Sequence, residues 1–294
     1  VKEILSEKAG GTTVIKGVSG KFGGSRSESP VLSFKSLVTI GAGGYNCPVS
    51  RKITEVHGEP HKDDEHFCGG YREYWENVEG LEDPEGPIEI HFVDEVIPGY
   101  FWLFPLGEGR VNVGIGMVLG LMDKQKKKLK SLQASVIANH PSFKERFADA
   151  EMIEGTGKGW QLPFGSPRKG EKNQPRRAYS PGALLVGDAA SLVDPFSGEG
   201  VGNALVSGEM AARHVIENKG GQEYQTELWE ALGPELTNSF KMQKMSRRKW
   251  LLNWFVGKAS RKPVIQEMMT EMIASKEAQE NLHSKWFLVK TLLF

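Results

Sequence analysis

The stretch from Gly182 to Ile216 constrains the fold more than any other part of this sequence. Residues 183–186 form a short, unbroken apolar run that ends at Gly187-Asp188, which is typical of a strand buried on both faces of a sheet. Apolar residues from Val201 to Ile216 recur at the spacing of one helix face. The segment between them, 194–202, is rich in glycine. The sequence therefore predicts a strand, a glycine-rich turn and a helix in succession.

This order of elements favours a bound anionic or reducible cofactor. A helix N-terminus presents free backbone N–H groups, and glycines let a phosphate or an electron-rich ring approach the backbone closely. Asp188 follows the buried strand, where open α/β sheets place ligand hydroxyls and where an unpaired carboxylate costs stability. On spacing alone the alternative is an ordinary strand-turn-helix crossover, because glycine-rich turns are frequent.

The residues of this segment also resemble a known motif. Gly187-Asp188-Ala189-Ala190, Asp194-Pro195, Gly198-Glu199-Gly200 and Asn203-Ala204-Leu205 resemble the second FAD motif of flavin-dependent reductases and hydroxylases, and most of all that of the geranylgeranyl reductase family. In such proteins the aspartate meets a ribityl hydroxyl, and the proline and glycine turn lie beside the isoalloxazine ring. The resemblance implies that FAD binds at Gly187, Asp188, Pro195, Gly198, Gly200, Val201, Gly202 and Asn203.

Tyr100, Trp102 and Phe104 alternate along an expected strand, so they would share one face of a sheet. One interpretation is plain sheet core, which aromatic residues favour. The other is an apolar wall for a hydrophobic substrate. The run Tyr100-x-Trp102-x-Phe104-Pro105 resembles the Y-x-W-x-F-P signature of geranylgeranyl reductases, in which it shapes the isoprenoid cavity. The resemblance implies that these three residues bind the substrate.

Two departures from the family pattern are visible. Gly41-Ala42-Gly43-Gly44, followed by Asn46 and Arg51, resembles a middle motif of these flavoproteins in which an aspartate stands where this chain has Gly43. The G-x-G-x-x-G fingerprint for the FAD pyrophosphate is absent. In the run that begins at Gly41, Asn46 stands where the third glycine of the motif should be. We expect that the chain lacks the N-terminal part of its FAD-binding lobe. The alternative is a degenerate homologue that never had it.

The elements expected along the chain define an α/β protein with α+β character. Residues 1–8 are predicted to end a helix, and residues 124–140 to form one with a basic first turn. Short strands are predicted within 12–15, 31–40, 69–78, 88–93, 100–105 and 110–117, the last three forming an antiparallel meander. We expect an incomplete Rossmann-like FAD-binding lobe (1–52 and 178–218), an antiparallel-sheet substrate lobe (53–177) and a C-terminal helical region (219–294).

The charge balance and the cysteine count indicate which partners and which cellular compartment to expect. The 37 basic and 37 acidic residues cancel, so no overall field favours nucleic acid, and no nucleic-acid partner is predicted. Two cysteines in 294 residues indicate a reducing compartment, and we expect a cytoplasmic chain. Residues 241–257 mix five cations with tryptophan and leucine before Gly257. Either the C-terminal helices pack on the body, or they make peripheral contact with a membrane.

The sequence gives less support for a metal site or a proton donor than for an FAD site. His57, His61, Asp63, Asp64, His66 and Cys68 form the densest set of potential metal ligands, but Pro60 and many charged neighbours favour a solvated loop, and no metal is predicted. Tyr100 and Cys47 are candidate proton donors, although sequence alone assigns no catalytic residue.

The leading hypothesis is an FAD-dependent oxidoreductase that reduces carbon-carbon double bonds of a geranylgeranyl or other prenyl lipid. NAD(P)H or another reductant would supply the electrons. One alternative is a flavin-dependent monooxygenase or halogenase that shares the Gly187-Asp188 motif. The other is a non-catalytic fragment, given the missing fingerprint and Gly43.

Overall fold

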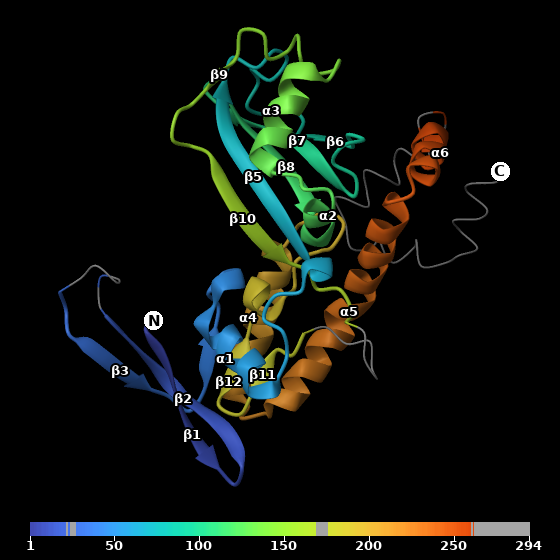
Figure 1. Cartoon of the computed structure of the whole chain (residues 1–294). Helices are drawn as coiled ribbons and strands as arrows, with labels where there is room; N and C mark the ends of the chain where they lie inside the picture. Colours follow the sequence, from blue (N-terminus) through green and yellow to red (C-terminus); the bar gives the residue numbers. More distant parts are fainter. Residues whose placement is uncertain (22, 24–27, 169–175, 260, 262–294) are drawn as a thin grey trace.

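The computed structural model describes residues 1–21, 23, 28–168, 176–259 and 261 (Figure 1). Strands in this part of the chain form three sheets. The first is antiparallel, in the order β1 (Glu3–Ala9), β2 (Thr12–Lys21) and β3 (Val31–Lys35). The second has the order β11 (Tyr179–Ser180), β12 (Ala183–Leu185) and β4 (Thr39–Gly41), with β12 parallel to β4.

The largest sheet is antiparallel and carries the aromatic face predicted from the sequence. Its order is β10 (Lys158–Pro163), β5 (Phe67–Glu76), β8 (Arg110–Val118), β7 (Gly99–Gly107) and β6 (Glu89–His91), with β9 (Glu151–Met152) beside β5. Consecutive strands β6, β7 and β8 pair as neighbours, which confirms the predicted meander.

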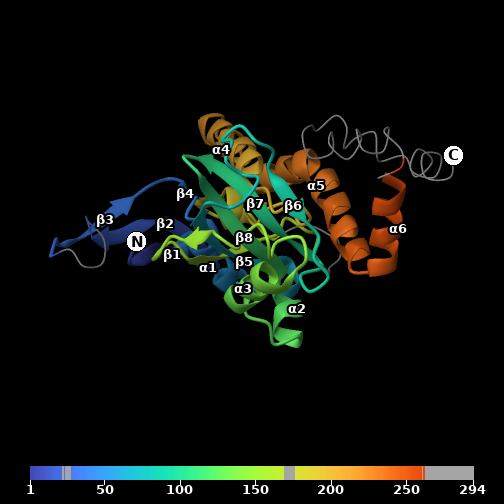
Figure 2. The same cartoon turned by 90° about the horizontal axis from the view of Figure 1, so that it is seen from above.

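The helices surround these sheets. They are α1 (Pro48–His57), α2 (Leu119–Lys124), α3 (Leu129–Asn139), α4 (Val201–Ile216), α5 (Gly221–Ser246) and α6 (Lys249–Ala259), with short 3₁₀ turns η1 (Gly44–Asn46), η2 (Asp64–His66) and η3 (Gly187–Ala190). Seen from above, α2 and α3 lie on one side of the large sheet, and α4 and α5 lie on the other (Figure 2). No helix among the described residues is long and apolar enough to cross a bilayer.

The two larger buried clusters account for most of the core. One forms around β4 and β12, with α1, α4 and α5 packed on them; Leu185, Tyr224 and Leu228 are among its most buried members. The other lies behind the large sheet, where Phe101, Leu103 and Ile115 meet α3. Removing such apolar surface from water is the main favourable term in folding. The predicted division into lobes at residues 52, 177 and 218 stays a prediction.

The end of the large sheet is joined by backbone contacts to the loop that follows η3. Phe164, just after β10, forms an isolated parallel bridge with Val193. Gly165 N donates to the carbonyl of Val193 at 2.8 Å, and Val193 N donates to the carbonyl of Pro163 at 3.2 Å. Strand β10 thus leads from the large sheet directly to the loop that follows η3.

Two local predictions are wrong. Residues 1–8 do not end a helix, because Glu3–Ala9 pairs along its length with β2, and Gly10 and Gly11 have positive φ angles that close the hairpin. The helix predicted over 124–140 is interrupted between α2 and α3, where Lys126 has φ +52° and Lys128 caps α3. Lys126, Lys127 and Lys128 of the basic run therefore lie in the break, whereas Lys124 ends α2 and Lys130 lies in the first turn of α3.

Candidate functional site

The predicted strand-turn-helix is present as β12, η3 and α4. Gly187 is the second residue after β12 and the first of η3, and it has φ +54°, a backbone angle that favours glycine. A Cβ on Gly187 would lie 3.0 Å from the Cβ of Ala204, and Gly187 N donates to Ser207 Oγ at 3.0 Å. Helix α4 therefore approaches the strand end closely only because residue 187 has no side chain.

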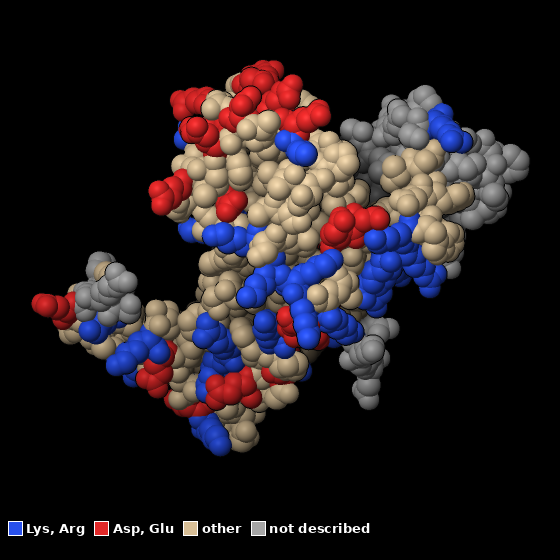
Figure 3. All heavy atoms as spheres, turned by 45° about the horizontal axis from the view of Figure 1, so that its top comes forward, with Lys and Arg blue, Asp and Glu red and all other residues tan. Residues whose placement is uncertain are grey.

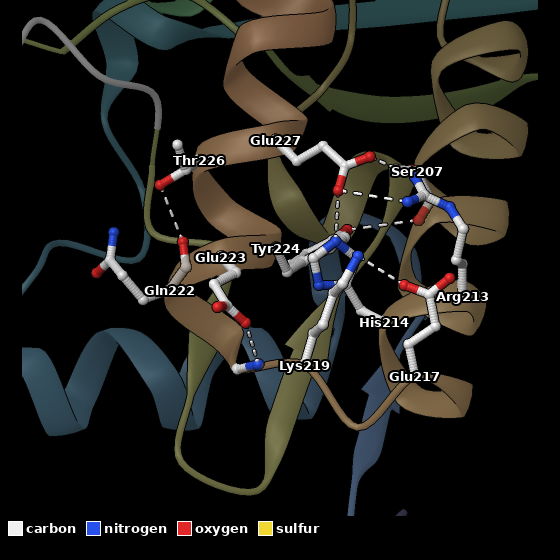
Figure 4. A network of polar contacts seen from close by, with 11 residues as sticks. Ser207, Arg213, His214, Glu217, Lys219, Gln222, Glu223, Tyr224, Thr226 and Glu227 are labelled. Carbon is white, nitrogen blue, oxygen red and sulfur yellow. Dashed lines mark hydrogen bonds and ion pairs between the residues drawn. The ribbon is translucent and has the colours of Figure 1, made fainter.

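A polar network fastens this strand end to α5 (Figure 4). The Tyr224 hydroxyl donates to the backbone carbonyl of Leu185 at 2.7 Å. Glu227 on α5 pairs with Arg213 and with His214 Nε2, the latter at 2.7 Å, and both partners lie on α4. These hydrogen bonds, Arg213 foremost, lower the pKa of Glu227 to about 2. The network positions α4 and α5, and Arg213, His214, Tyr224 and Glu227 are not among the residues that line the cavity next to Tyr100.

Asp188 meets the requirement for a hydroxyl-binding carboxylate. It is partly buried, and this burial raises its pKa. Within the described residues, no other residue donates a hydrogen bond to its carboxylate, and a Cβ on Gly200 would lie 3.2 Å from Asp188 Oδ1. A desolvated acceptor beside a glycine at the start of a helix fits a sugar-alcohol hydroxyl such as the ribityl chain of FAD carries.

The loop from Asp194 to Gly200 is held mainly by its own aspartate and by α5. Asp194 Oδ1 accepts hydrogen bonds from Phe196 N (2.9 Å), Ser197 N (2.7 Å) and Ser239 Oγ (2.6 Å). The amide of Gln243 donates to the carbonyl of Pro195 at 2.5 Å. Sequence reasoning missed Ser239 and Gln243, because a serine and a glutamine inside an amphipathic helix carry no motif.

The glycines of the middle motif lie next to η3. Strand β4 runs parallel to β12, Val186 N donates to the carbonyl of Gly41 at 3.1 Å, and η1 packs against η3. A Cβ on Gly43 would lie 3.2 Å from the Cα of Cys47, so the family aspartate would require Cys47 to shift. The glycine at position 43 therefore fits the close packing against Cys47, which leaves little space for a side chain.

A cavity of about 240 Å³ lies between the large sheet and the Asp194–Gly200 loop. Tyr100, Trp102 and Phe104 all line it, together with Pro195 and Gly198 of the loop. Their neighbours Phe101 and Leu103 point to the opposite face of β7 and are fully buried in the core. The three aromatic residues thus line a cavity on one face of β7, and the core lies on the other face; that they bind a substrate stays a prediction.

Further apolar residues complete the cavity. Phe92 and Phe196 face one another from the sheet and the loop, with ring centroids 6.1 Å apart and planes 28° apart. Phe92 is 38% exposed, whereas Phe164 at the junction is buried. Sequence reasoning missed this pair, because neither phenylalanine lies at a motif position that signals it.

The candidate proton donors separate in space. Tyr100 lines the cavity, and burial raises the pKa of its hydroxyl. Cys68 lines it too, and burial raises the pKa of its thiol to about 12. Cys47 is buried at the start of α1, next to Gly41 and Gly43, and does not line the cavity. The cavity therefore holds two groups that keep their protons at neutral pH.

The three histidines of the predicted loop have separate partners. His57 Nε2 lies 3.3 Å from Ser180 Oγ, His61 Nδ1 accepts from Arg176 at 2.9 Å, and His66 Nδ1 lies 2.5 Å from Ser166 Oγ. Burial lowers the pKa of His66 to about 4. Over the described ranges, no three histidine, cysteine or acidic side chains are placed to hold one metal ion.

Comparison with known proteins finds relatives among the geranylgeranyl reductases. A family model described as the geranylgeranyl reductase catalytic domain matches residues 67–157, which begin with β5 and include β9. Curated relatives are named digeranylgeranylglycerophospholipid reductase. The protein from Thermoplasma acidophilum is 34% identical over 156 residues, or 53% of this chain and 34% of the relative. That from Picrophilus torridus is 28% identical over 231 residues, or 78% of this chain and 52% of the relative.

Solved structures share the fold. A geranylgeranyl bacteriochlorophyll reductase-like protein from Thermoplasma acidophilum aligns with a TM-score of 0.69 and 21% identity, covering 98% of this chain and 67% of that one. A myxobacterial chondrochloren halogenase, described as FAD-dependent, aligns with a TM-score of 0.57 and 21% identity, covering 82% of this chain and 52% of that one.

Fold and site together define an FAD-dependent oxidoreductase fold with an aromatic-walled cavity. Residues 67–157 carry the catalytic domain of the geranylgeranyl reductase family, which is flavin-dependent. It spans about a third to a half of the length of the curated relatives it matches.

Proposed function

We propose that this chain takes part in the FAD-dependent reduction of carbon-carbon double bonds in a geranylgeranyl or other prenyl lipid. The observation that carries the proposal is the cavity itself, because its wall of Tyr100, Trp102 and Phe104 directly faces Pro195 and Gly198 of the loop. A chain lying against the aromatic wall would also lie beside the predicted flavin loop. The relatives named digeranylgeranylglycerophospholipid reductase support a lipid with geranylgeranyl chains.

The residues present fit FAD on the side of η3 and α4. Asp188 would accept from a ribityl hydroxyl, and Pro195, Gly198 and Gly200 would lie beside the ring. Gly187, Val201, Gly202 and Asn203 form the surrounding turn and helix start. Reduced FAD, when bound, supplies a hydride, and NAD(P)H or another reductant supplies its electrons. The chain's own residues orient the alkene, exclude water and keep protons at the Tyr100 hydroxyl and the Cys68 thiol.

Anaerobic turnover tests this function. The chain would be incubated with FAD, dithionite and geranylgeraniol without oxygen, and the lipid analysed by mass spectrometry. A reductase adds two hydrogens per reduced bond. A product that forms only with oxygen, or no product from a sample shown to bind FAD, would reject the proposal in favour of a monooxygenase or of a non-catalytic fragment.

We also propose peripheral contact with a membrane through the C-terminal helices of a cytoplasmic chain. No acidic residue occurs between Glu235 and Glu267, whereas 241–249 holds five cations. Lysine and arginine side chains gather along the side of the molecule where α5 runs toward α6 (Figure 3). Trp250 and Trp254 lie one turn apart on α6 and are 69% and 42% exposed. Exposed tryptophans next to cations suit an anionic lipid surface.

A further inference from the structure

The floor of the cavity is formed by backbone. Gly70 on β5 pairs with Gly116 on β8, which pairs in turn with Tyr100 on β7, so the two glycines lie side by side on the cavity face. A Cβ built on Gly70 would have no atom within 4 Å other than those of its two chain neighbours. A Cβ on Gly116 would make only ordinary contacts, 3.5 Å from Cys68 Sγ and 3.7 Å from the Trp102 ring. Side chains at these positions would project into the cavity.

One end of this floor is closed by a fixed aromatic plane. The indole of Trp102 lies over Gly114, since a Cβ on Gly114 would be 2.1 Å from Trp102 Cζ2. Trp102 Nε1 donates to Asn112 Oδ1 at 3.2 Å, which fixes the rotation of the ring. The cavity therefore has a flat floor at Gly70 and Gly116 and an apolar end at Trp102.

A single unpaired acceptor lies on the α5 side of the same cavity. Gln243 lines the cavity and is only 3% exposed. Because the carbonyl of Pro195 can only accept, the atom facing it must be the amide nitrogen, and the orientation of the amide group follows. Gln243 Oε1 is then left without a donor from any described residue. A buried acceptor without a donor is unfavourable, so a ligand that brings one gains affinity.

We propose that the cavity binds a prenyl chain in one direction, with its hydroxyl end at Gln243 and its tail across the floor of Gly70 and Gly116 toward Trp102. The planar alkene units of such a chain can lie flat on a floor that lacks side chains. A bulkier floor would exclude them. The inference rests on the proposed function, because it assumes that a prenyl lipid is the ligand.

Equilibrium binding tests the inference without turnover. Farnesol, a soluble prenyl alcohol, and farnesyl methyl ether are titrated into the 294-residue chain by calorimetry. The ether has the same tail but no donor. We expect farnesol to bind about two- to tenfold more tightly than the ether, the range for one net hydrogen bond. The Gln243→Leu variant should lose this difference, whereas Gln222→Leu, on the exposed start of α5, should keep it.

The floor is tested with valine, which suits a strand. Gly70→Val should weaken binding of both ligands at least about tenfold by filling the cavity. The matched change Gly159→Val lies on the neighbouring strand β10, where a Cβ would meet only the Gly70 carbonyl at 3.9 Å, and should change affinity less than twofold. Circular dichroism would confirm that each variant is folded.

The outcomes distinguish the two claims. If the wild-type chain binds alcohol and ether equally, or if Gly70→Val binds farnesol like the wild type, the inference is wrong and the lipid-reductase proposal stands. If the wild-type chain binds neither ligand, both are wrong.

Discussion

The Tyr100 hydroxyl donates a hydrogen bond to the backbone carbonyl of Ser197 and so links strand β7 to the loop that precedes α4. The loop turns at Gly198, where φ is +76° and a Cβ would lie 3.2 Å from the Tyr100 hydroxyl. The first residue of the aromatic signature therefore contacts the turn of the flavin motif. This contact makes one site from two motifs that are about a hundred residues apart in the sequence.

Asp188→Ala should weaken FAD binding without destabilising the protein. The carboxylate is desolvated, and the hydrogen bond it accepts comes from its own backbone N–H, so its removal breaks no hydrogen bond to another described residue. Hydrogen bonds to a charged group contribute about 1.5–3 kcal/mol, which corresponds to a loss of roughly ten- to 150-fold in affinity. Flavin fluorescence titration measures the affinity, and thermal unfolding measures stability. Asp123→Ala, an exposed change on α2, is the control; equal FAD affinity in both variants would contradict the assignment.

The Glu227 network predicts a pH-dependent stability. The pKa of this carboxylate is lowered to about 2 by Arg213 and His214. A lowered carboxyl pKa stabilises the fold above the ordinary value of 4.5, and this contribution disappears as pH falls toward 2. Glu227→Gln should therefore melt below the wild type at pH 7, with a gap that narrows between pH 5 and pH 2.

Glu230→Gln, one turn further along α5 and exposed, is the matched control and should melt like the wild type at pH 7. A melting gap for Glu227→Gln that stays constant with pH would show that the ion pairs do not cause it. Because Glu227 is partly exposed, solvent screens the pairs, and the effect should also shrink in high salt.

The packing of Trp102 makes Gly114 less tolerant of an added side chain than Gly116. Gly114→Ala should destabilise the protein by about 1–3 kcal/mol, because its Cβ would overlap the indole ring at 2.1 Å. Gly116→Ala, two residues along the same strand, should cost far less, because its nearest contact is 3.5 Å. Chemical denaturation monitored by tryptophan fluorescence gives both values. Equal destabilisation would contradict the seating of Trp102 on Gly114.

Membrane contact predicts a dependence on charge. Arg247→Glu with Arg248→Glu should reduce co-sedimentation with phosphatidylglycerol-containing vesicles by at least about tenfold, since each cation near an anionic surface contributes about 1 kcal/mol. Binding should also fall as salt rises. Lys8→Glu with Lys35→Glu, on the distant first sheet, is the matched control. Binding that ignores salt and both charge changes would favour plain packing of the helices.

Sequence reasoning found the parts of the site that carry periodic or motif signals. The apolar run, the glycine turn and the helical spacing between Gly182 and Ile216 became β12, η3 and α4. The alternation of Tyr100, Trp102 and Phe104 gave their shared face. What the face contacts was undecided, because period two is the same for a core face and a cavity face.

The rest depends on tertiary contacts that leave no local pattern. Gln243 and Ser239 hold the flavin loop from a helix that is not close to it in sequence, and their residue types are ordinary on α5. The sequence of residues 1–11 does not distinguish a helix end from a strand, because Gly10-Gly11 can stop a helix or close a hairpin. Pairing with β2 selects the hairpin. A glycine in a cavity floor, such as Gly70, also has no local sequence pattern that predicts its position.

The most direct test of the central claim is a crystal structure of this chain with FAD and farnesol. We predict that the isoalloxazine ring lies within van der Waals distance, about 4 Å, of Pro195 and Gly198, with the prenyl chain between the ring and Trp102. A ring bound away from the Asp194–Gly200 loop, or a prenyl chain outside the aromatic cavity, would contradict it.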